Sequence, residues 1–233
     1  MSTADLACLR LYQLVSPALP VGAFSYAEGL EVLVQSGRLT AVEPLQQWLQ
    51  AELERGAVAL EAAALAALQA AWGRCQQGEA AALAELLDLD GWLLAQREAP
   101  ELRAQQRQMG QSLLQLLADL DQPLPVLLQD LPPRSLAWPA AFAWAAQALE
   151  LGSPAIETAY LYSWVANQLS AAVRLVPLGP TQAQRLQLQL APLIAERGRQ
   201  LALADPRQLW NGGVGAGLAQ LQQAELYSRL FRS

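Results

Sequence analysis

Residues 16–31 read S-P-A-L-P-V-G-A-F-S-Y-A-E-G-L-E and interrupt a chain that otherwise consists mostly of helix-forming residues. The stretch combines two prolines with two glycines, two aromatic residues and two carboxylates. Pro17 and Pro20 each fix φ and push the preceding residue towards an extended conformation. The chain is therefore predicted to be non-helical from residue 16 to about residue 23.

A helix is expected directly after this junction. Ser25 and Glu28 have the spacing of a capping box and Gly37 supplies a stop, so the pattern predicts a helix over 25–36. Such a helix would place Glu28 and Glu31 on one face of its first two turns. The local pattern fits an ordinary rigid turn and capped helix as well as a functional surface.

Most of the remaining chain also has a helical pattern. Alanine, leucine, glutamine, glutamate and arginine dominate, and these residues are strong helix formers. Apolar spacing and glycine or proline stops predict further helices at 3–15, 40–56, 57–77, 79–87, 100–120, 139–151, 153–175 and from 181 onward. No run has the sustained alternation of a β-strand.

Local signals refine these boundaries. Thr40 and Glu43 form a second capping box, Ser153 has the position of an N-cap before an N1 proline, and a short turn is expected at 88–91. The fold class that follows is all-α, a single globular domain of about nine or ten helices. Residues 1–210 would form the helical body, and residues 211–233 a glycine hinge and tail of the same domain.

Composition limits the possible functions. The chain has 233 residues, of which 53% are hydrophobic and only 15% charged, and its net charge of −6 argues against nucleic acid as a partner. No apolar run is expected to reach membrane-spanning length, and residues 1–10 lack the basic start of a signal peptide, so a cytoplasmic protein is expected.

The basic residues are unusual. The chain has no histidine, and all fifteen of its basic residues are arginine. Imidazole metal ligands, Schiff-base chemistry and a P-loop lysine are therefore excluded within one chain. Cys8 and Cys75 stand alone in the sequence and are expected to be buried free thiols. An enzyme could still use carboxylates, serine, tyrosine or arginine, but the catalytic repertoire is narrow, and we assign no catalytic, cofactor-binding or metal-binding residue.

The C-terminal segment has two notable parts. Residues 211–217 read N-G-G-V-G-A-G, which lacks the lysine of a phosphate loop and indicates a flexible hinge. Residues 227–233 read Y-S-R-L-F-R-S, and tyrosine, phenylalanine and arginine are common interface anchors. The tail is therefore either a docking peptide or a segment packed on its own core.

Other residues favour structural roles. Trp138, Trp144 and Trp164 are expected in the core rather than in a ligand platform. Arg174 lies in an apolar stretch, so we expect a largely buried arginine that pairs with an acid or with several carbonyls, or else a contact with another subunit or a partner protein.

Taken together, four motifs resemble the UreF family of urease accessory proteins. They are Ser16–Glu31, E-L-R-A-Q-Q-R-Q-M-G at Glu101–Gly110, A-A-V-R-L-V-P-L-G at Ala171–Gly179, and the terminal Tyr227–Ser233. The resemblance extends over nearly the whole chain.

The resemblance implies an all-helical, non-catalytic protein required for nickel insertion into apo-urease. It implies a scaffold that links UreH (also called UreD) to the GTPase UreG, modulates GTP hydrolysis and forms a homodimer within that assembly. Where the family usually has a His-Pro pair this chain has Trp138–Pro139, so no role for imidazole in nickel passage is expected here. A general helical adaptor unrelated to urease, and a helical enzyme using carboxylates and metal, are the alternatives.

The resemblance also implies two sets of partner-binding residues. Those implied for docking of UreH/UreD are Tyr227, Arg229, Leu230, Phe231, Arg232 and Ser233. Those implied for a surface serving UreG or the dimer are Gly22, Ser25, Tyr26, Gly29, Glu31 and Arg174.

Overall fold

A computed structural model describes residues 3–132 and 134–233, which form ten α-helices and four short 3₁₀ turns without any strand. The all-α prediction is confirmed. The α-helices are α1 (Thr3–Leu14), α2 (Leu30–Gln35), α3 (Val42–Arg55), α4 (Ala57–Gln76), α5 (Ala80–Ala95), α6 (Pro100–Asp119), α7 (Trp138–Ala148), α8 (Ala155–Leu175), α9 (Pro180–Leu201) and α10 (Val214–Gln222). The 3₁₀ turns are η1 (Ala23–Ser25), η2 (Val126–Leu128), η3 (Pro206–Gln208) and η4 (Gln223–Glu225).

Helix α4 is the centre of the fold. It packs against α3, α5, α7, α8 and α9, and its side chains are buried nearly all round from Ala57 to Leu65. Its small alanines let neighbouring helices approach closely, and a helix that is apolar on every side is stable only when it is enclosed. Near its end, Trp72 donates from Nε1 to the carbonyl oxygen of Ala140 in α7, at 2.9 Å.

The stretch Val42–Gln76, which joins α3 and α4, is long and apolar enough to cross a membrane by length and composition. The expectation that no run reaches this length is therefore wrong. However, 72% of its apolar window is buried inside the fold, so packing against the surrounding helices accounts for its composition.

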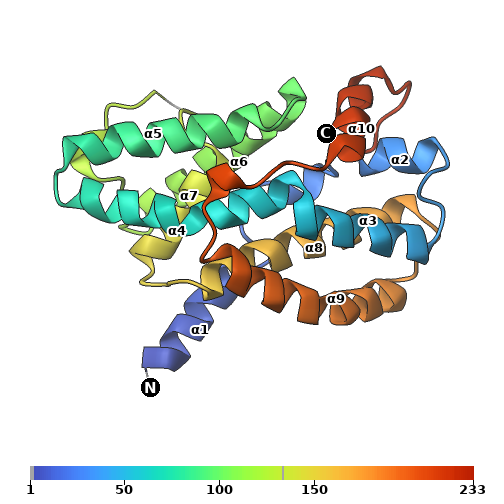
Figure 1. Cartoon of the computed structure of the whole chain (residues 1–233), viewed down its shortest axis with the longest axis horizontal. Helices are drawn as coiled ribbons and strands as arrows, with labels where there is room; N and C mark the ends of the chain where they lie inside the picture. The colour runs from blue at the N-terminus through green and yellow to red at the C-terminus, as the bar shows by residue number, and fades with distance from the viewer. Residues whose placement is uncertain (1–2, 133) are drawn as a thin grey trace.

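The two ends of the molecule contain different helices. At one end α5 and α7 pack on α4 and α6 packs on α7, while at the other α10 lies beside α2 (Figure 1). Helix α1 projects from the body, and the segment after α9 runs back across the molecule to reach α10 (Figure 1). The Gly212 N–H donates to the carbonyl oxygen of Arg55 at 2.7 Å and ties this segment to the end of α3. Helix α10, near the end of the chain, is therefore brought beside α2, near its beginning.

The predicted turn at 88–91 is wrong, because α5 continues from Ala80 to Ala95. Asp90 lies within the helix and is buried, and its Oδ1 accepts the backbone N–H of Ala137 at 3.0 Å. This contact caps the start of α7 from a neighbouring helix. Burial raises the pKa of Asp90 to about 6, although the hydrogen bond from Ala137 opposes the shift.

The predicted caps at Thr40 and Ser153 are also wrong. Helix α3 begins at Val42 after Ala41, and neither that N-cap nor the one of α8 makes a side-chain capping bond. The N-cap of α8 is Pro154, and the Ser153 hydroxyl donates instead to Oε1 of Glu157 at 2.6 Å. A serine that matches an N-cap can thus use its side chain in another local hydrogen bond.

Candidate partner-binding site

The C-terminal tail packs on the proline- and glycine-rich junction with which the sequence analysis began. The carbonyl oxygen of Ser233 accepts the backbone N–H of Ala27 at 2.8 Å and of Glu28 at 3.0 Å, and the Arg232 N–H donates to the carbonyl oxygen of Ser25 at 2.9 Å. The predicted capping box at Ser25 and Glu28 is therefore wrong, because the tail takes the N–H that such a cap would satisfy.

The backbone of the junction also excludes the predicted helix over 25–36. Glu28 has φ +51° and Gly29 has φ +84°, so two successive residues adopt left-handed conformations and α2 begins only at Leu30. A Cβ on Gly29 would lie 2.9 Å from the backbone nitrogen of Gln220 in α10. Glycine at this position thus permits both the turn and the close approach of α10. Consequently Glu28 and Glu31 do not share a helix face.

Glu31 connects α2 to the tail. Its Oε1 accepts the N–H of Leu230 at 2.8 Å, and its Oε2 accepts the N–H of Phe231 at 3.0 Å. The side-chain amides of Gln35 and Gln223 also donate to this carboxylate, at 3.3 and 3.2 Å. Four donors satisfy a carboxylate that is only 3% exposed, as a buried charge requires.

Arg174 brings the third motif to the same place. Its guanidinium lies 5.1 Å from the centroid of the Phe231 ring, which is 3% exposed. The expectation that Arg174 is largely buried is wrong, because the residue is exposed on α8 and caps the ring from outside. The junction, the Arg174 segment and the tail, three segments singled out from the sequence, thus meet at one site.

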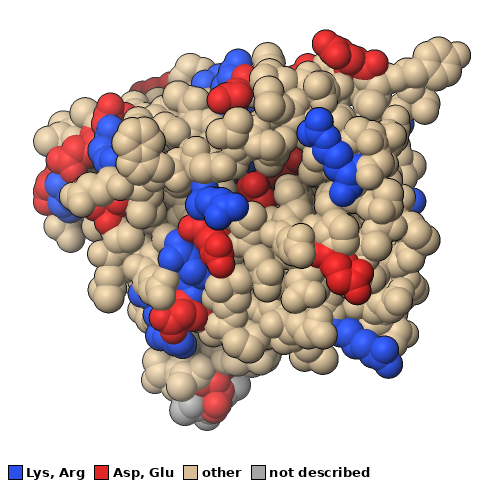
Figure 2. Space-filling model, turned by 45° about the vertical axis from the view of Figure 1, so that its right-hand side comes forward, with Lys and Arg blue, Asp and Glu red and all other residues tan. Residues whose placement is uncertain are grey.

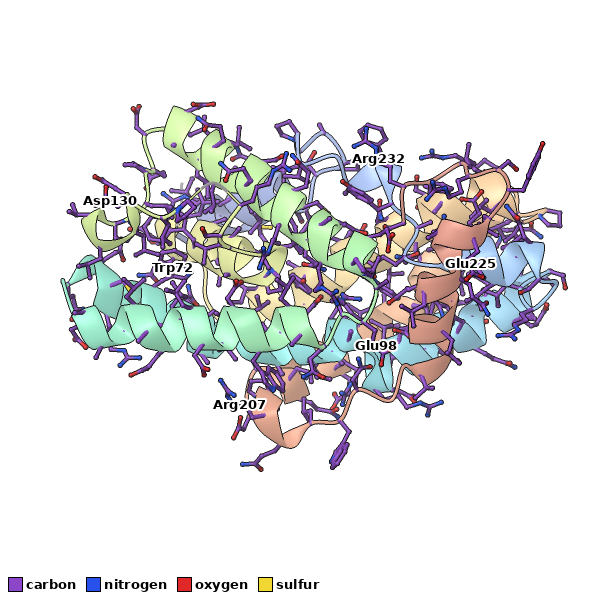
Figure 3. The ribbon with its side chains drawn as sticks, turned by 90° about the horizontal axis from the view of Figure 1, so that it is seen from above. Trp72, Glu98, Asp130, Arg207, Glu225 and Arg232 are labelled. Atoms are coloured by element: carbon purple, nitrogen blue, oxygen red, sulfur yellow. The ribbon has the colours of Figure 1, made fainter. Side chains whose placement is uncertain are left out.

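The candidate residues of the tail divide into buried and exposed ones. Phe231 and Ser233 are buried, whereas Tyr227 is fully exposed and the side chain of Leu230 is 59% exposed. Arg229 is exposed as well, and so is Arg232, at the outer edge of the molecule in Figure 3. The tail is therefore packed on its own core and still presents side chains outward.

The candidate residues of the junction are less accessible. Tyr26, Gly29 and Glu31 are buried, while Gly22 and Ser25 are half-buried. Gly22 adopts φ +74°, and a Cβ at this position would meet open space, so the glycine supports the turn into η1 through its backbone conformation. Figure 2 shows a mostly uncharged face, on which acidic and basic residues lie side by side at the left and stand singly at the right. Recognition at such a face depends more on shape and apolar contact than on a charged patch.

Beneath the tail lies a buried ionic cluster that sequence reasoning missed. Arg97, 3% exposed, donates from Nε to Oε1 of Glu61 at 2.8 Å and from a terminal nitrogen to Oε2 of Glu28 at 3.3 Å. The Tyr160 hydroxyl donates to Oε2 of Glu61 at 2.8 Å, and Trp164 Nε1 donates to Oε2 of Glu28 at 3.2 Å. Helices α4 and α8 and the α5–α6 loop meet at this cluster.

Two glutamines extend the cluster to the tail. Gln106 donates to Oε1 of Glu61 at 3.3 Å, and Gln105 donates to Oε1 of Glu28 at 3.1 Å. The Ser233 hydroxyl in turn donates to Oε1 of Gln105. The end of the tail is therefore hydrogen-bonded to the ionic core of the body.

Burial and charge pairing shift the ionisation of this cluster in opposite directions. Burial raises the pKa of Glu61, because it disfavours the charged carboxylate. Burial also disfavours the charged form of Arg97, but the Coulombic attraction of Glu61 and Glu28 outweighs this effect and raises the pKa of Arg97. Burial, followed by the charge of Glu61, raises the pKa of Tyr160 well above its ordinary value. The pKa of nearby Glu52 is raised to about 7, chiefly by burial.

One signal for this cluster was present in the sequence. Glu61 is the only charged residue between Ala57 and Trp72, an otherwise apolar stretch at the centre of the fold. A charge in such a helix must be paired, because an isolated buried carboxylate is very costly. Its partner Arg97 lies 36 positions later in a loop, where no sequence pattern indicates the contact.

A cavity of about 610 Å³ opens beside the cluster, between α1, the junction, α6, α8 and α9. Glu28, Glu61 and Tyr160 line it and are buried, and the part of the cavity that they line is its inner end. Trp138 and Trp144 are buried as predicted, but Trp138 and the half-buried Trp164 also line the cavity. Within residues 3–132 and 134–233, no group of three or more carboxylates or cysteines is arranged to hold a metal ion.

Comparison with known proteins gives a consistent assignment. The profile of the UreF family matches residues 39–191. The urease accessory protein UreF of Alkalilimnicola ehrlichii is 40% identical over 228 residues, which cover 98% of this chain and 96% of the relative. The UreF proteins of Trichormus variabilis and Thermosynechococcus vestitus are 41% and 40% identical, covering 97% and 98% of this chain and 95% and 99% of their own. The chain belongs to the UreF family of urease accessory proteins.

Proposed function

We propose that this chain is a non-catalytic scaffold for nickel insertion into apo-urease. It links UreH/UreD to the GTPase UreG, modulates GTP hydrolysis by UreG, and acts as a homodimer in the cytoplasm. The observation that carries the proposal is the tail, whose backbone is held by Glu31 while Tyr227 and Leu230 point outward.

The geometry of the tail supports a docking role. Hydrogen bonds from Leu230 and Phe231 to Glu31 fix the backbone, so the exposed side chains are ordered before a partner arrives. Preorganisation lowers the entropic cost of binding. Tyrosine and arginine are common energetic anchors of interfaces, and the tail exposes Tyr227, Arg229 and Arg232. We assign this outward face to UreH/UreD.

The state of the buried carboxylates favours a scaffold over an enzyme. Glu28 and Glu61 are occupied by hydrogen bonds from Arg97 and from neighbouring side chains, so neither is a free general base. The face that includes Ser25 and Arg174 lies beside the tail, and we assign it to UreG or to a second copy.

Loss of the chain tests the accessory role. In cells carrying the cognate urease genes, deletion of this chain is expected to leave urease assembled but poor in nickel and inactive, and restoring the chain is expected to recover nickel content and activity. Nickel-replete, active urease in the deletion strain would overturn the proposal and favour the general adaptor.

Co-purification tests the linking role separately. The intact chain is expected to retain UreH/UreD and UreG together, whereas a chain ending at Leu226 keeps α10 and η4 but lacks the tail and is expected to lose UreH/UreD. Equal recovery of UreH/UreD with both chains would show that the tail is not part of the binding site.

A further inference from the structure

The carboxylates of Glu28 and Glu61 lie at the inner end of the 610 Å³ cavity, and Nε2 of Gln187, a donor without a partner among the described residues, also lines the cavity. The donors of Tyr160, Gln105 and Gln106 already point at the carboxylates of Glu28 and Glu61. Oε1 of Glu28 and Oε2 of Glu61 each accept one hydrogen bond from these groups, and a carboxylate oxygen can accept two. A guest that contacts these two carboxylates would therefore have to donate.

An enclosed and unpaired group supports the same conclusion. Gln106 is 3% exposed and lines the cavity, and its Oε1 has no hydrogen-bond partner among the described residues. Buried side-chain oxygens without a partner are uncommon, because each loses its hydration without compensation. A donor that entered here would find an acceptor on Gln106 as well as on the carboxylates.

Charge favours a cation as that donor. Glu28 and Glu61 both line the cavity, and both pair with one buried arginine, Arg97. Among the described residues that line the cavity, Arg174 is the only basic one, and its guanidinium stacks on Phe231. The inner end thus has more acidic groups than cations to balance them, so a positive charge is stabilised there.

The walls suit an apolar or aromatic stem. Val21, Met109, Trp138, Trp164 and Leu169 line the cavity around the polar end. Small-molecule sites are commonly apolar pockets of about 300–1,000 Å³ with a few convergent polar groups. Indole rings also attract cations through their faces.

We propose that this cavity binds a small organic cation, namely a primary ammonium, amidinium or guanidinium group on an apolar or aromatic stem. The head donates to the carboxylates of Glu28 and Glu61, and the stem lies against Trp138 and Trp164. This site adjoins the tail through Gln105, which accepts a hydrogen bond from the Ser233 hydroxyl, but it does not depend on the accessory function.

Titration calorimetry on the intact chain tests the charge requirement. Benzylamine carries the proposed ammonium, and benzyl alcohol has nearly the same shape without the charge. At pH 7.5 benzylamine is expected to bind about tenfold more tightly or better, since a charge-assisted hydrogen bond is worth at least that factor. Equal affinity for the two compounds, or no binding of benzylamine, would overturn the proposal.

Variants test the location. Glu61→Gln removes one charge at the inner end and is expected to weaken benzylamine binding about tenfold, whereas Glu43→Gln removes an exposed charge on α3 and leaves it unchanged. Because Glu61→Gln could unfold the core, Ala166→Leu serves as a second variant that narrows the cavity at a half-buried wall position. Unchanged binding to a folded Ala166→Leu protein would show that the cavity is not the site.

Discussion

The backbone N–H of Phe231 donates to Oε2 of Glu31 at 3.0 Å, joining two residues 200 positions apart. With the N–H of Leu230 on Oε1 of the same carboxylate, this contact fixes the tail on α2. The tail adds its own support, because Ser233 occupies the N–H groups of Ala27 and Glu28. The tail and the junction therefore hold each other in their observed conformations.

Replacing Glu31 with alanine is expected to loosen the tail without unfolding the body. The change leaves the N–H groups of Leu230 and Phe231 unpaired, which costs about 1–3 kcal/mol locally. Amide hydrogen exchange at residues 230–233 is expected to accelerate, and urease activation in cells is expected to fall. Glu225→Ala, at an exposed glutamate, is the control. Unaltered exchange of the tail in Glu31→Ala would contradict this role.

Replacing Arg97 with alanine is expected to destabilise the whole fold. Glu28 and Glu61 would lose their buried cation, and breaking a buried ion pair from one side costs about 3–5 kcal/mol. Chemical denaturation measures the loss. Arg185→Ala removes an exposed arginine from α9 and is expected to change the free energy of unfolding by less than about 0.5 kcal/mol. A small loss in Arg97→Ala would mean that the cluster relaxes or takes up protons.

The raised pKa of Glu52 predicts that the stability of the fold depends on pH. Burial raises its pKa in the folded protein from 4.5 to about 7, so the folded state holds the proton more tightly than the unfolded state. The stability from this group is fully present below about pH 4 and is lost as the pH rises towards 7. Glu52→Gln does not titrate, so its free energy of unfolding relative to the wild type should increase by roughly 2.5 kcal/mol from pH 5 to pH 8.

Denaturant titrations of the two proteins at both pH values measure this difference. Glu43→Gln, at an exposed glutamate, is the control and should follow the wild type. If Glu52→Gln and the wild type change in parallel between pH 5 and pH 8, Glu52 is not the group responsible.

Two glycines provide a matched pair for the junction. Gly22 and Gly29 both have left-handed φ, but a Cβ on Gly22 meets open space, whereas one on Gly29 meets the backbone of Gln220. Gly22→Ala should therefore cost about 1 kcal/mol from backbone strain alone. Gly29→Ala should cost at least twice as much and displace α10, visible as faster hydrogen exchange at residues 214–222. Similar costs for the two variants would contradict the close approach of α10.

The sequence predicted the helices well because their apolar periodicity and their stops are local. The helix at 57–77, for example, appears as Ala57–Gln76, and the helix at 100–120 as Pro100–Asp119. The predicted caps at Ser25, Thr40 and Ser153 were wrong. At Ser25 the reason is a competing tertiary contact, since Ser233 takes the N–H of Glu28.

The site was only partly predictable for the same reason. The sequence singled out Glu31, Arg174 and the tail, but it could not show that they touch, because they are brought together by packing of α2, α8 and α10. Arg174 was expected to be buried, yet the buried arginine is Arg97, which lies in a loop without any distinctive pattern. Arg97 is held by its contact with Glu61, and a contact between residues 36 positions apart cannot be predicted from local sequence patterns.

The affinity of the intact chain for its cognate UreH/UreD protein tests the central claim most directly. Tyr227→Ala combined with Leu230→Ala removes two exposed side chains of the tail while leaving the backbone contacts with Glu31 in place. Surface plasmon resonance should show binding at least tenfold weaker for this double variant, with unchanged thermal stability. Equal affinity of the double variant and the wild type would contradict the assignment of the tail as the docking surface.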